Sequence, residues 1–115
     1  MNSNHPDRER IELERPTGVP DLDPVLHFPK RTMIMAVLSA STVADFSFLK
    51  EQLELTDSDL SKQMRTLAEA GYVNVRKIGH GRSGSTEYSA TRKGRKAYAA
   101  YKKQLAGMLG LDPEV

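Results

Sequence analysis

Apolar side chains recur at helical spacing in four stretches of the chain. The first stretch begins after Pro29, which suits a first helical turn because proline has no amide hydrogen to leave unpaired. We expect this helix to end near residues 40–42, with an apolar face made of Met33, Ile34, Val37 and Leu38. A shorter helix is predicted over residues 47–54, with a shared face made of Phe46, Leu49 and Leu53.

The most clearly marked helix is predicted over residues 56–70. Thr56 is its candidate N-cap, and Asp57 and Asp59 follow in the first turn, where the helix dipole favours carboxylates. Gly71 can take the left-handed conformation that ends a helix. The buried face of this helix is predicted to consist of Leu60, Met64, Leu67 and Ala68.

After Gly71 the period of the pattern changes from helical to alternating. Val73 and Val75 alternate with polar residues, and so do Thr86, Tyr88 and Ala90. The segment between them, residues 79–85, is rich in glycine and carries basic side chains. The pattern therefore predicts a β-hairpin with a long basic tip.

The last predicted helix runs from about residue 92 to residue 109, and Thr91 is its candidate cap. Its apolar positions follow the spacing of a coiled-coil seam, and they are Tyr98, Tyr101, Leu105 and Met108. Because the seam is only about two heptads long, it predicts an interface between two chains and not a free-standing coiled coil. The alternative interpretation of Tyr98 and Tyr101 is that they line a small-molecule pocket between subunits.

The order of these elements predicts a winged helix-turn-helix, which is mainly α-helical with a small β-hairpin (α+β) and has a C-terminal dimerisation helix. We expect this domain to span residues 22–110. Residues 1–21 are dense in charge and contain several prolines, a composition that favours a flexible N-terminal arm. Residues 111–115 are expected to form a short tail.

Side chains suited to DNA contacts occupy the face of the 56–70 helix opposite its apolar positions. In a helix-turn-helix the second helix enters the major groove, where arginine and lysine pair with guanine and serine bonds to bases or phosphates. The candidates on this face are Ser58, Ser61, Lys62, Arg65 and Thr66. The hairpin adds candidates for contacts with the phosphate backbone or the minor groove, namely Arg76, Lys77, His80 and Arg82.

The total charge is nearly balanced, with 17 basic and 15 acidic residues and a net charge of +2. Its distribution is uneven, because residues 71–103 hold nine basic residues and a single acidic residue, Glu87, whereas acidic residues outnumber basic ones in residues 1–70. The basic segment includes the start of the last helix, with Arg92, Lys93, Arg95 and Lys96. Solvated surface charge is the alternative explanation, and the ordered architecture favours nucleic acid.

The chain resembles the winged-helix transcriptional regulators of the MarR/ArsR-like kind, especially the small group that is little more than the DNA-binding domain. The resemblance covers about residues 22–109 and is carried by Leu22–His27, Asp45–Lys50, Leu55–Ser61, Leu67–Val73, Thr86–Tyr88 and Thr91–Arg95. It implies a homodimeric repressor or activator. Two recognition helices related by two-fold symmetry would read a near-palindromic operator in double-stranded DNA.

By residue-wise transfer, the resemblance places Ser58, Ser61, Lys62 and Arg65 on the groove-facing side of the recognition helix, and His80 and Arg82 in the wing. The chain departs from the family pattern in two ways. It has no cysteine, a common ligand in ArsR-type metal sensors, and it is shorter than MarR-type proteins usually are. A small-molecule effector would therefore have to bind at the dimer interface.

Several kinds of chemistry have no support in the sequence. The lack of cysteine excludes disulfides and thiolate nucleophiles, and the three histidines are too scattered to indicate a metal site. No catalytic or phosphate-binding motif is present, so we expect neither an enzyme nor a cofactor. No apolar run could span a bilayer and no signal peptide is evident, so a cytoplasmic location without a membrane partner is expected. The main alternative to DNA binding is a winged-helix module that binds another protein.

Overall fold

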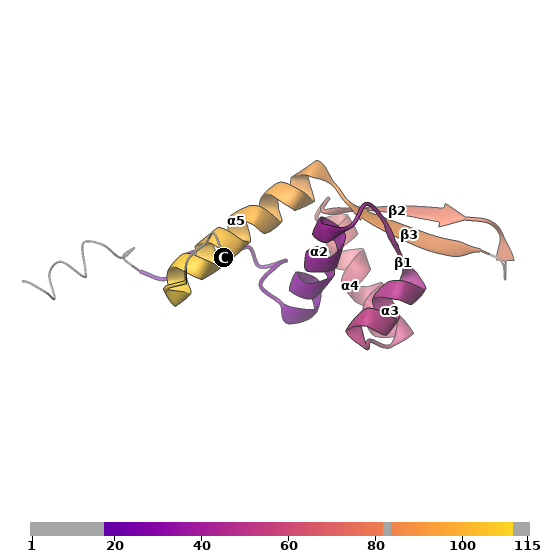
Figure 1. The fold of residues 1–115 in the computed structure, drawn as a ribbon, viewed down its shortest axis with the longest axis horizontal. Helices are drawn as coiled ribbons and strands as arrows, with labels where there is room; N and C mark the ends of the chain where they lie inside the picture. Colours follow the sequence, from indigo (N-terminus) through magenta and orange to yellow (C-terminus); the bar gives the residue numbers. More distant parts are fainter. Residues whose placement is uncertain (1–17, 82–83, 112–115) are drawn as a thin grey trace, which may run out of the picture.

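A computed structural model of the protein describes residues 18–81 and 84–111. The described chain has four helices and one small antiparallel sheet (Figure 1). The elements, in chain order, are α2 (Pro29–Ala40), β1 (Ala44–Asp45), α3 (Phe46–Leu53), α4 (Asp57–Glu69), β2 (Val73–Ile78), β3 (Ser85–Ala90) and α5 (Arg92–Leu109). This arrangement confirms the predicted α+β winged helix-turn-helix with a C-terminal helix. The predicted N-terminal arm lies mostly, and the C-terminal tail almost entirely, outside the described residues.

The helix ends follow the predicted local signals. Pro29 occupies the first turn of α2. The Thr56 hydroxyl accepts a hydrogen bond from the Asp59 amide at 3.1 Å, and the Thr91 hydroxyl accepts one from the Gly94 amide at 2.9 Å. Gly71 has a φ of +81°, the left-handed conformation predicted for the residue that stops α4. Short-range side-chain chemistry therefore sets the boundaries of these helices.

The core lies where α2, α3 and α4 pack together beneath the sheet (Figure 1). The largest fully buried side chains are Leu26, Ile34, Met35, Leu38, Leu49, Leu60 and Leu67. Burying each such side chain contributes about 1.5–3 kcal/mol. The buried face predicted for α4 is confirmed at Leu60, Met64 and Leu67, and Ala68 packs partly buried against the same core.

The face predicted for α2 is wrong at one position. Met33 is 53% exposed, whereas Ile34, Met35 and Leu38 are buried. Successive residues of a helix are rotated by about 100°, so the buried face of α2 is centred away from Met33. Met33 instead lines the outer surface beside Pro29.

The sheet has the strand order β1-β3-β2, and both pairs are antiparallel. β1, which the alternation does not predict, pairs Ala44 with Tyr88 and so ties the hairpin to the helices. Beyond this base the β2–β3 hairpin extends away from the helices, while α5 extends to the opposite side (Figure 1).

α5 meets the base of the hairpin at a very close backbone contact. A Cβ atom added at Gly94 would lie 2.1 Å from the carbonyl oxygen of Tyr72, so only glycine fits there. Further along α5, Tyr101 is 4% exposed, and its hydroxyl lies 3.0 Å from Nδ1 of His27. No helix in the described part of the chain is both long and apolar enough to cross a membrane.

Candidate nucleic-acid interface

The outward face of α4 carries the predicted DNA-contacting side chains. Ser58, Ser61, Lys62 and Arg65 are all exposed, on the side of the helix opposite its buried leucines. Thr66 is half-buried, and its hydroxyl donates a hydrogen bond to the Lys62 carbonyl at 3.2 Å. The four exposed side chains are therefore available to a ligand, whereas the Thr66 hydroxyl already has a hydrogen-bond partner within the helix.

A groove separates this face of α4 from the hairpin. It has a volume of about 400 Å³ and is lined by Phe46, Ser61, Met64, Arg65, Val75, Lys77, Thr86 and Tyr88. The fold thus brings Arg65 of the helix and Lys77 of β2 to one concave surface, although they are separated in sequence by the turn at Gly71. Serine, threonine and two cations at its rim give this surface donors for base edges and phosphates.

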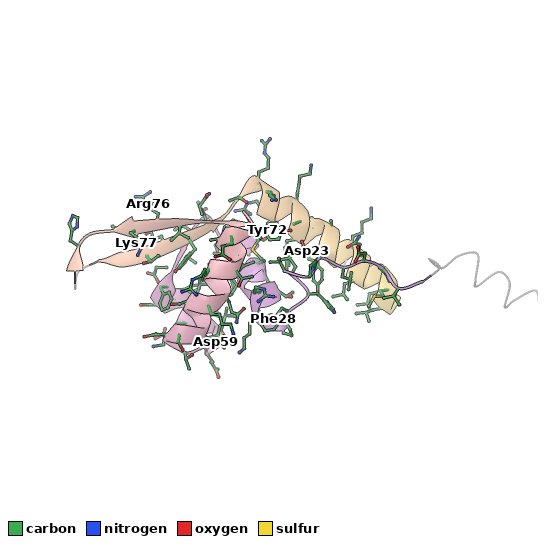
Figure 2. All side chains as sticks on the ribbon, turned by 180° about the vertical axis from the view of Figure 1, so that it is seen from behind. Asp23, Phe28, Asp59, Tyr72, Arg76 and Lys77 are labelled. Atoms are coloured by element: carbon green, nitrogen blue, oxygen red, sulfur yellow. The ribbon has the colours of Figure 1, made fainter. Side chains whose placement is uncertain are left out.

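The two predicted cations of β2 face opposite ways. Figure 2 shows Arg76 and Lys77 on opposite sides of the strand, with Lys77 on the side of α4. In the register of the hairpin Arg76 stands across from Glu87, and Lys77 stands across from Thr86. The only acidic residue of the basic segment 71–103 is therefore opposite Arg76, which leaves Lys77 as the strand cation of the groove.

The described part of the hairpin tip holds one of the two remaining predicted wing residues, His80. His80 is exposed there, between Gly79 and Gly81, both of which have positive φ. Arg82 lies outside the described residues. The glycines let the chain reverse at this point without strain, so the tip projects from the rest of the molecule.

The acidic residues at the start of α4 are paired with lysines from other helices. Lys50 of α3 lies 2.8 Å from a carboxylate oxygen of Asp57, and Lys30 of α2 forms an ion pair with Asp59. The hydrogen bonds from Lys30 and then from Gln63 lower the pKa of Asp59 below its usual value. The repulsion that the Asp59 carboxylate would exert on a phosphate is thus partly offset. The sequence pattern did not reveal this pairing, because Lys30 lies 29 residues before Asp59.

The model of one protein family, described as a winged helix DNA-binding domain, matches residues 31–109. The chain belongs to this family. The match covers α2 through α5 and therefore includes the groove and the hairpin. The match confirms the resemblance to winged-helix regulators that was identified from the sequence.

Known proteins similar to this winged-helix chain include one archaeal relative and several solved structures. An uncharacterised protein of Methanocaldococcus jannaschii is 38% identical over 72 residues, which cover 62% of this chain and 77% of the relative. A transcriptional regulator homologue from Pyrococcus horikoshii OT3 has a TM-score of 0.70 at 27% identity, covering 75% of this chain and 85% of that structure. A MarR-family regulator from Porphyromonas gingivalis W83 has a TM-score of 0.59 at 15% identity, over 96% of this chain and 97% of that structure, and shows the fold alone.

The basic start of α5 in this winged-helix domain has two kinds of residue. Arg92, Lys93 and Lys96 are exposed. Arg95 is exposed as well, but its guanidinium donates hydrogen bonds to the Ser39 carbonyl at 3.1 Å and the Ser41 carbonyl at 3.3 Å, at the end of α2. Arg95 thus satisfies carbonyls that the helix leaves unpaired, which is a structural role.

The predicted seam on α5 is only partly on the surface. Met108 is 43% exposed, Leu105 and Tyr98 are half-buried, and the ammonium group of Lys102 lies 4.7 Å from the centre of the Tyr98 ring. Tyr101 is buried against His27 within the same chain, so it offers almost no area to a second chain. The 3-4-3 spacing misassigned Tyr101 because the side chain that buries it, His27, is 74 residues earlier.

Proposed function

We propose that this winged-helix protein regulates transcription as a homodimer that binds double-stranded DNA in a sequence-specific manner. The observation that carries the proposal is the groove that joins the exposed face of α4 to Lys77 of the hairpin. In this proposal α4 enters the major groove, whose width of about 12 Å admits one helix. Arg65 and Lys62 would pair with guanine, and Ser58 and Ser61 would contact bases or phosphates.

The hairpin would supply contacts that do not depend on sequence. Lys77 lies beside α4, so it would meet the phosphates that flank the major groove. His80 and Arg82 at the tip would follow the backbone or enter the minor groove. Arg76 faces away from α4, and its partner across the hairpin is Glu87. We therefore expect Arg76 to contribute less to DNA binding than Lys77 does.

The homodimer in this proposal uses the C-terminal part of α5, beyond the buried Tyr101. Met108 and Leu109 are exposed there, and the half-buried Leu105 and Tyr98 lie about one and three turns earlier on the same helix. A two-fold dimer would place two copies of α4 in major grooves about 34–36 Å apart, so the operator would be near-palindromic. An apolar hollow of about 390 Å³ beside α5, lined by His27, Phe28, Pro29, Thr32, Met33 and Tyr101, is where a small apolar effector would bind.

Selection from a random pool of duplex DNA with the purified protein tests the proposal. We expect enrichment of one near-palindromic motif. Retention on heparin at low salt, lost steeply as salt rises, would accompany it because the bound phosphates release counterions. Failure to enrich any motif together with no retention at low salt would contradict the proposal and favour a winged-helix module that binds another protein.

Sedimentation equilibrium tests the dimer separately. Met108 is exposed, so Met108→Glu places a charge on the proposed interface without disturbing the core of the chain. We expect this variant to sediment as a monomer and the wild-type protein as a dimer. Lys103→Glu, an exposed substitution on the same helix, is the matched control and should leave the dimer intact. A dimer that survives Met108→Glu would place the interface elsewhere.

A further inference from the structure

One polar side chain of α4 is buried among its apolar neighbours. Gln63 is 3% exposed and lies between the buried residues Leu60, Met64 and Leu67. Burying an amide is unfavourable unless its donors and acceptor have partners. The contacts of Gln63 therefore show what this residue does on the helix that carries the proposed base contacts.

Both ends of the Gln63 amide are held. Its nitrogen donates a hydrogen bond to a carboxylate oxygen of Asp59 at 2.9 Å, and its oxygen accepts one from Nη1 of Arg31 at 2.7 Å. Asp59 is one turn earlier on α4, while Arg31 belongs to the first turn of α2. The amide thus joins two helices in a fixed orientation.

Arg31 is itself fixed by the segment that precedes α2. Its Nε donates to the Val25 carbonyl at 2.6 Å, and its guanidinium carbon lies 4.2 Å from the centre of the Phe28 ring. Next to it, Lys30 holds the other carboxylate oxygen of Asp59. α4 is therefore attached to α2 at two points one helical turn apart, through Asp59 and through Gln63. The labels of Asp59 and Phe28 in Figure 2 mark where the two helices meet.

These polar contacts lie on one flank of α4, and the hairpin groove lies on the other. Gln63 is rotated by about 160° around the helix from Ser61 and Arg65, which line the groove. Apolar contacts tolerate small rotations of a helix, whereas hydrogen bonds to a planar amide are directional. Rotation of α4 would break the contacts of Gln63 and turn Ser61 and Arg65 away from their bases.

We propose that Arg31 and Gln63 are positioning residues that fix the rotation of α4 and thereby determine how sharply the protein discriminates its operator from other DNA. The inference rests on the proposed function, since it concerns base reading by α4. Neither residue needs to touch DNA. Loss of the pair should therefore reduce the preference for the operator without removing a phosphate contact.

The test uses the full-length chain and two duplexes, the motif enriched by the wild-type protein and an unrelated sequence of equal length. Gln63→Met keeps the size of the side chain and removes both hydrogen bonds. We expect the ratio of the two affinities to fall about tenfold, as is typical for the loss of one interaction network. The dependence of unrelated-duplex binding on salt should not change, because no cation that meets a phosphate is removed.

Two further variants separate positioning from stability. Ile34→Val, in the core of α2 and outside the polar contacts, should lower the melting temperature and leave the affinity ratio unchanged. Arg31→Met should match Gln63→Met, and it carries the same test if Gln63→Met does not fold. The double variant Arg31→Met with Gln63→Met should lose no more than either single variant, because each change alone disrupts the pair.

An unchanged affinity ratio in folded Gln63→Met or Arg31→Met protein would overturn the inference while leaving the proposed function intact. Losses that multiply in the double variant would also overturn it, since the residues would then act separately. If the wild-type protein enriches no motif, the proposed function fails first and this inference fails with it.

Discussion

α4 and the β2–β3 hairpin contribute to the same groove but are held in different ways. α4 buries Leu60, Gln63, Met64 and Leu67 and is capped at its start by Thr56. In β2 only Val73, at the base, is buried, and the residues from Asn74 to Lys77 are exposed. The helix is therefore fixed by the core, whereas the hairpin projects from it.

α4 and the hairpin also differ in how their charges are arranged. Both acidic residues at the start of α4 are paired with lysines of α2 and α3. The hairpin is basic on its groove side and has its one acidic residue on the other side. A fixed helix is suited to directional contacts with bases, and a projecting basic hairpin is suited to phosphates, whose attraction is less dependent on direction. This comparison explains why a chain with a net charge of +2 has a surface suited to DNA.

The largest effect is expected on stability, from a substitution in α5 that would displace the base of the hairpin. In Gly94→Ala the new Cβ would overlap the Tyr72 carbonyl, so we expect a loss of about 3 kcal/mol or more in the free energy of unfolding. Gly107→Ala is the control on the same helix, because nothing lies within 4 Å of the added carbon. It should stabilise the protein by up to about 1 kcal/mol. Equal effects of the two changes in urea denaturation would contradict the close contact at Gly94.

The next effect concerns base reading by α4. Arg65→Ala should weaken binding to the enriched motif by about 1–3 kcal/mol if Arg65 pairs with a guanine. A second selection from the random pool with this variant should give a motif relaxed at one position in each half-site. A motif unchanged at every position would exclude base reading by Arg65.

A smaller effect is expected on the hairpin. Lys77→Ala should weaken binding to all duplexes and reduce the slope of log affinity against log salt by about 1. Arg76→Ala is the matched comparison, because it removes the neighbouring cation on the opposite side of the strand. We expect it to change the slope less. A larger change for Arg76→Ala would mean that DNA lies on the other side of the hairpin.

The smallest effect is a pH dependence at the junction of α4 and β2. Burial and the hydrogen bond to Asp23 raise the pKa of Tyr72 from 10.0 to about 12 (Figure 2). The folded protein therefore retains this proton more strongly than the unfolded chain. Its contribution to stability is complete below about pH 10 and is lost as the pH rises towards 12. Tyr72→Phe should thus be less stable than wild type at pH 8, by about 1 kcal/mol.

Denaturation of both proteins at pH 8 and pH 11 measures this difference. The difference in the free energy of unfolding between wild type and Tyr72→Phe should be smaller at pH 11, because the contribution of the Tyr72 proton is then being lost. Tyr88 and Tyr98, whose pKa values are also raised, are present in both proteins, so their effects cancel in the comparison. A gap that is constant from pH 8 to pH 11 would show that Tyr72 does not link its proton to folding.

Features set by neighbours in sequence were predictable, and features set by distant partners were not. The cap at Thr56 and the stop at Gly71 depend on residues within one turn, and both were identified. β1 has only two residues and exists because β3 lies beside it, so no alternation could reveal it. Gln63 was missed because one of the two partners that make a buried amide acceptable at that position, Arg31, is far away in the chain.

The most direct test of the division between helix and hairpin is the ratio of affinities for the enriched motif and an unrelated duplex, measured at one salt concentration. It should be determined for the wild-type protein, Arg65→Ala and Lys77→Ala. We predict that the ratio falls for Arg65→Ala and stays at the wild-type value for Lys77→Ala, although both bind the motif more weakly. A ratio that falls equally in both variants, or only in Lys77→Ala, would contradict the account.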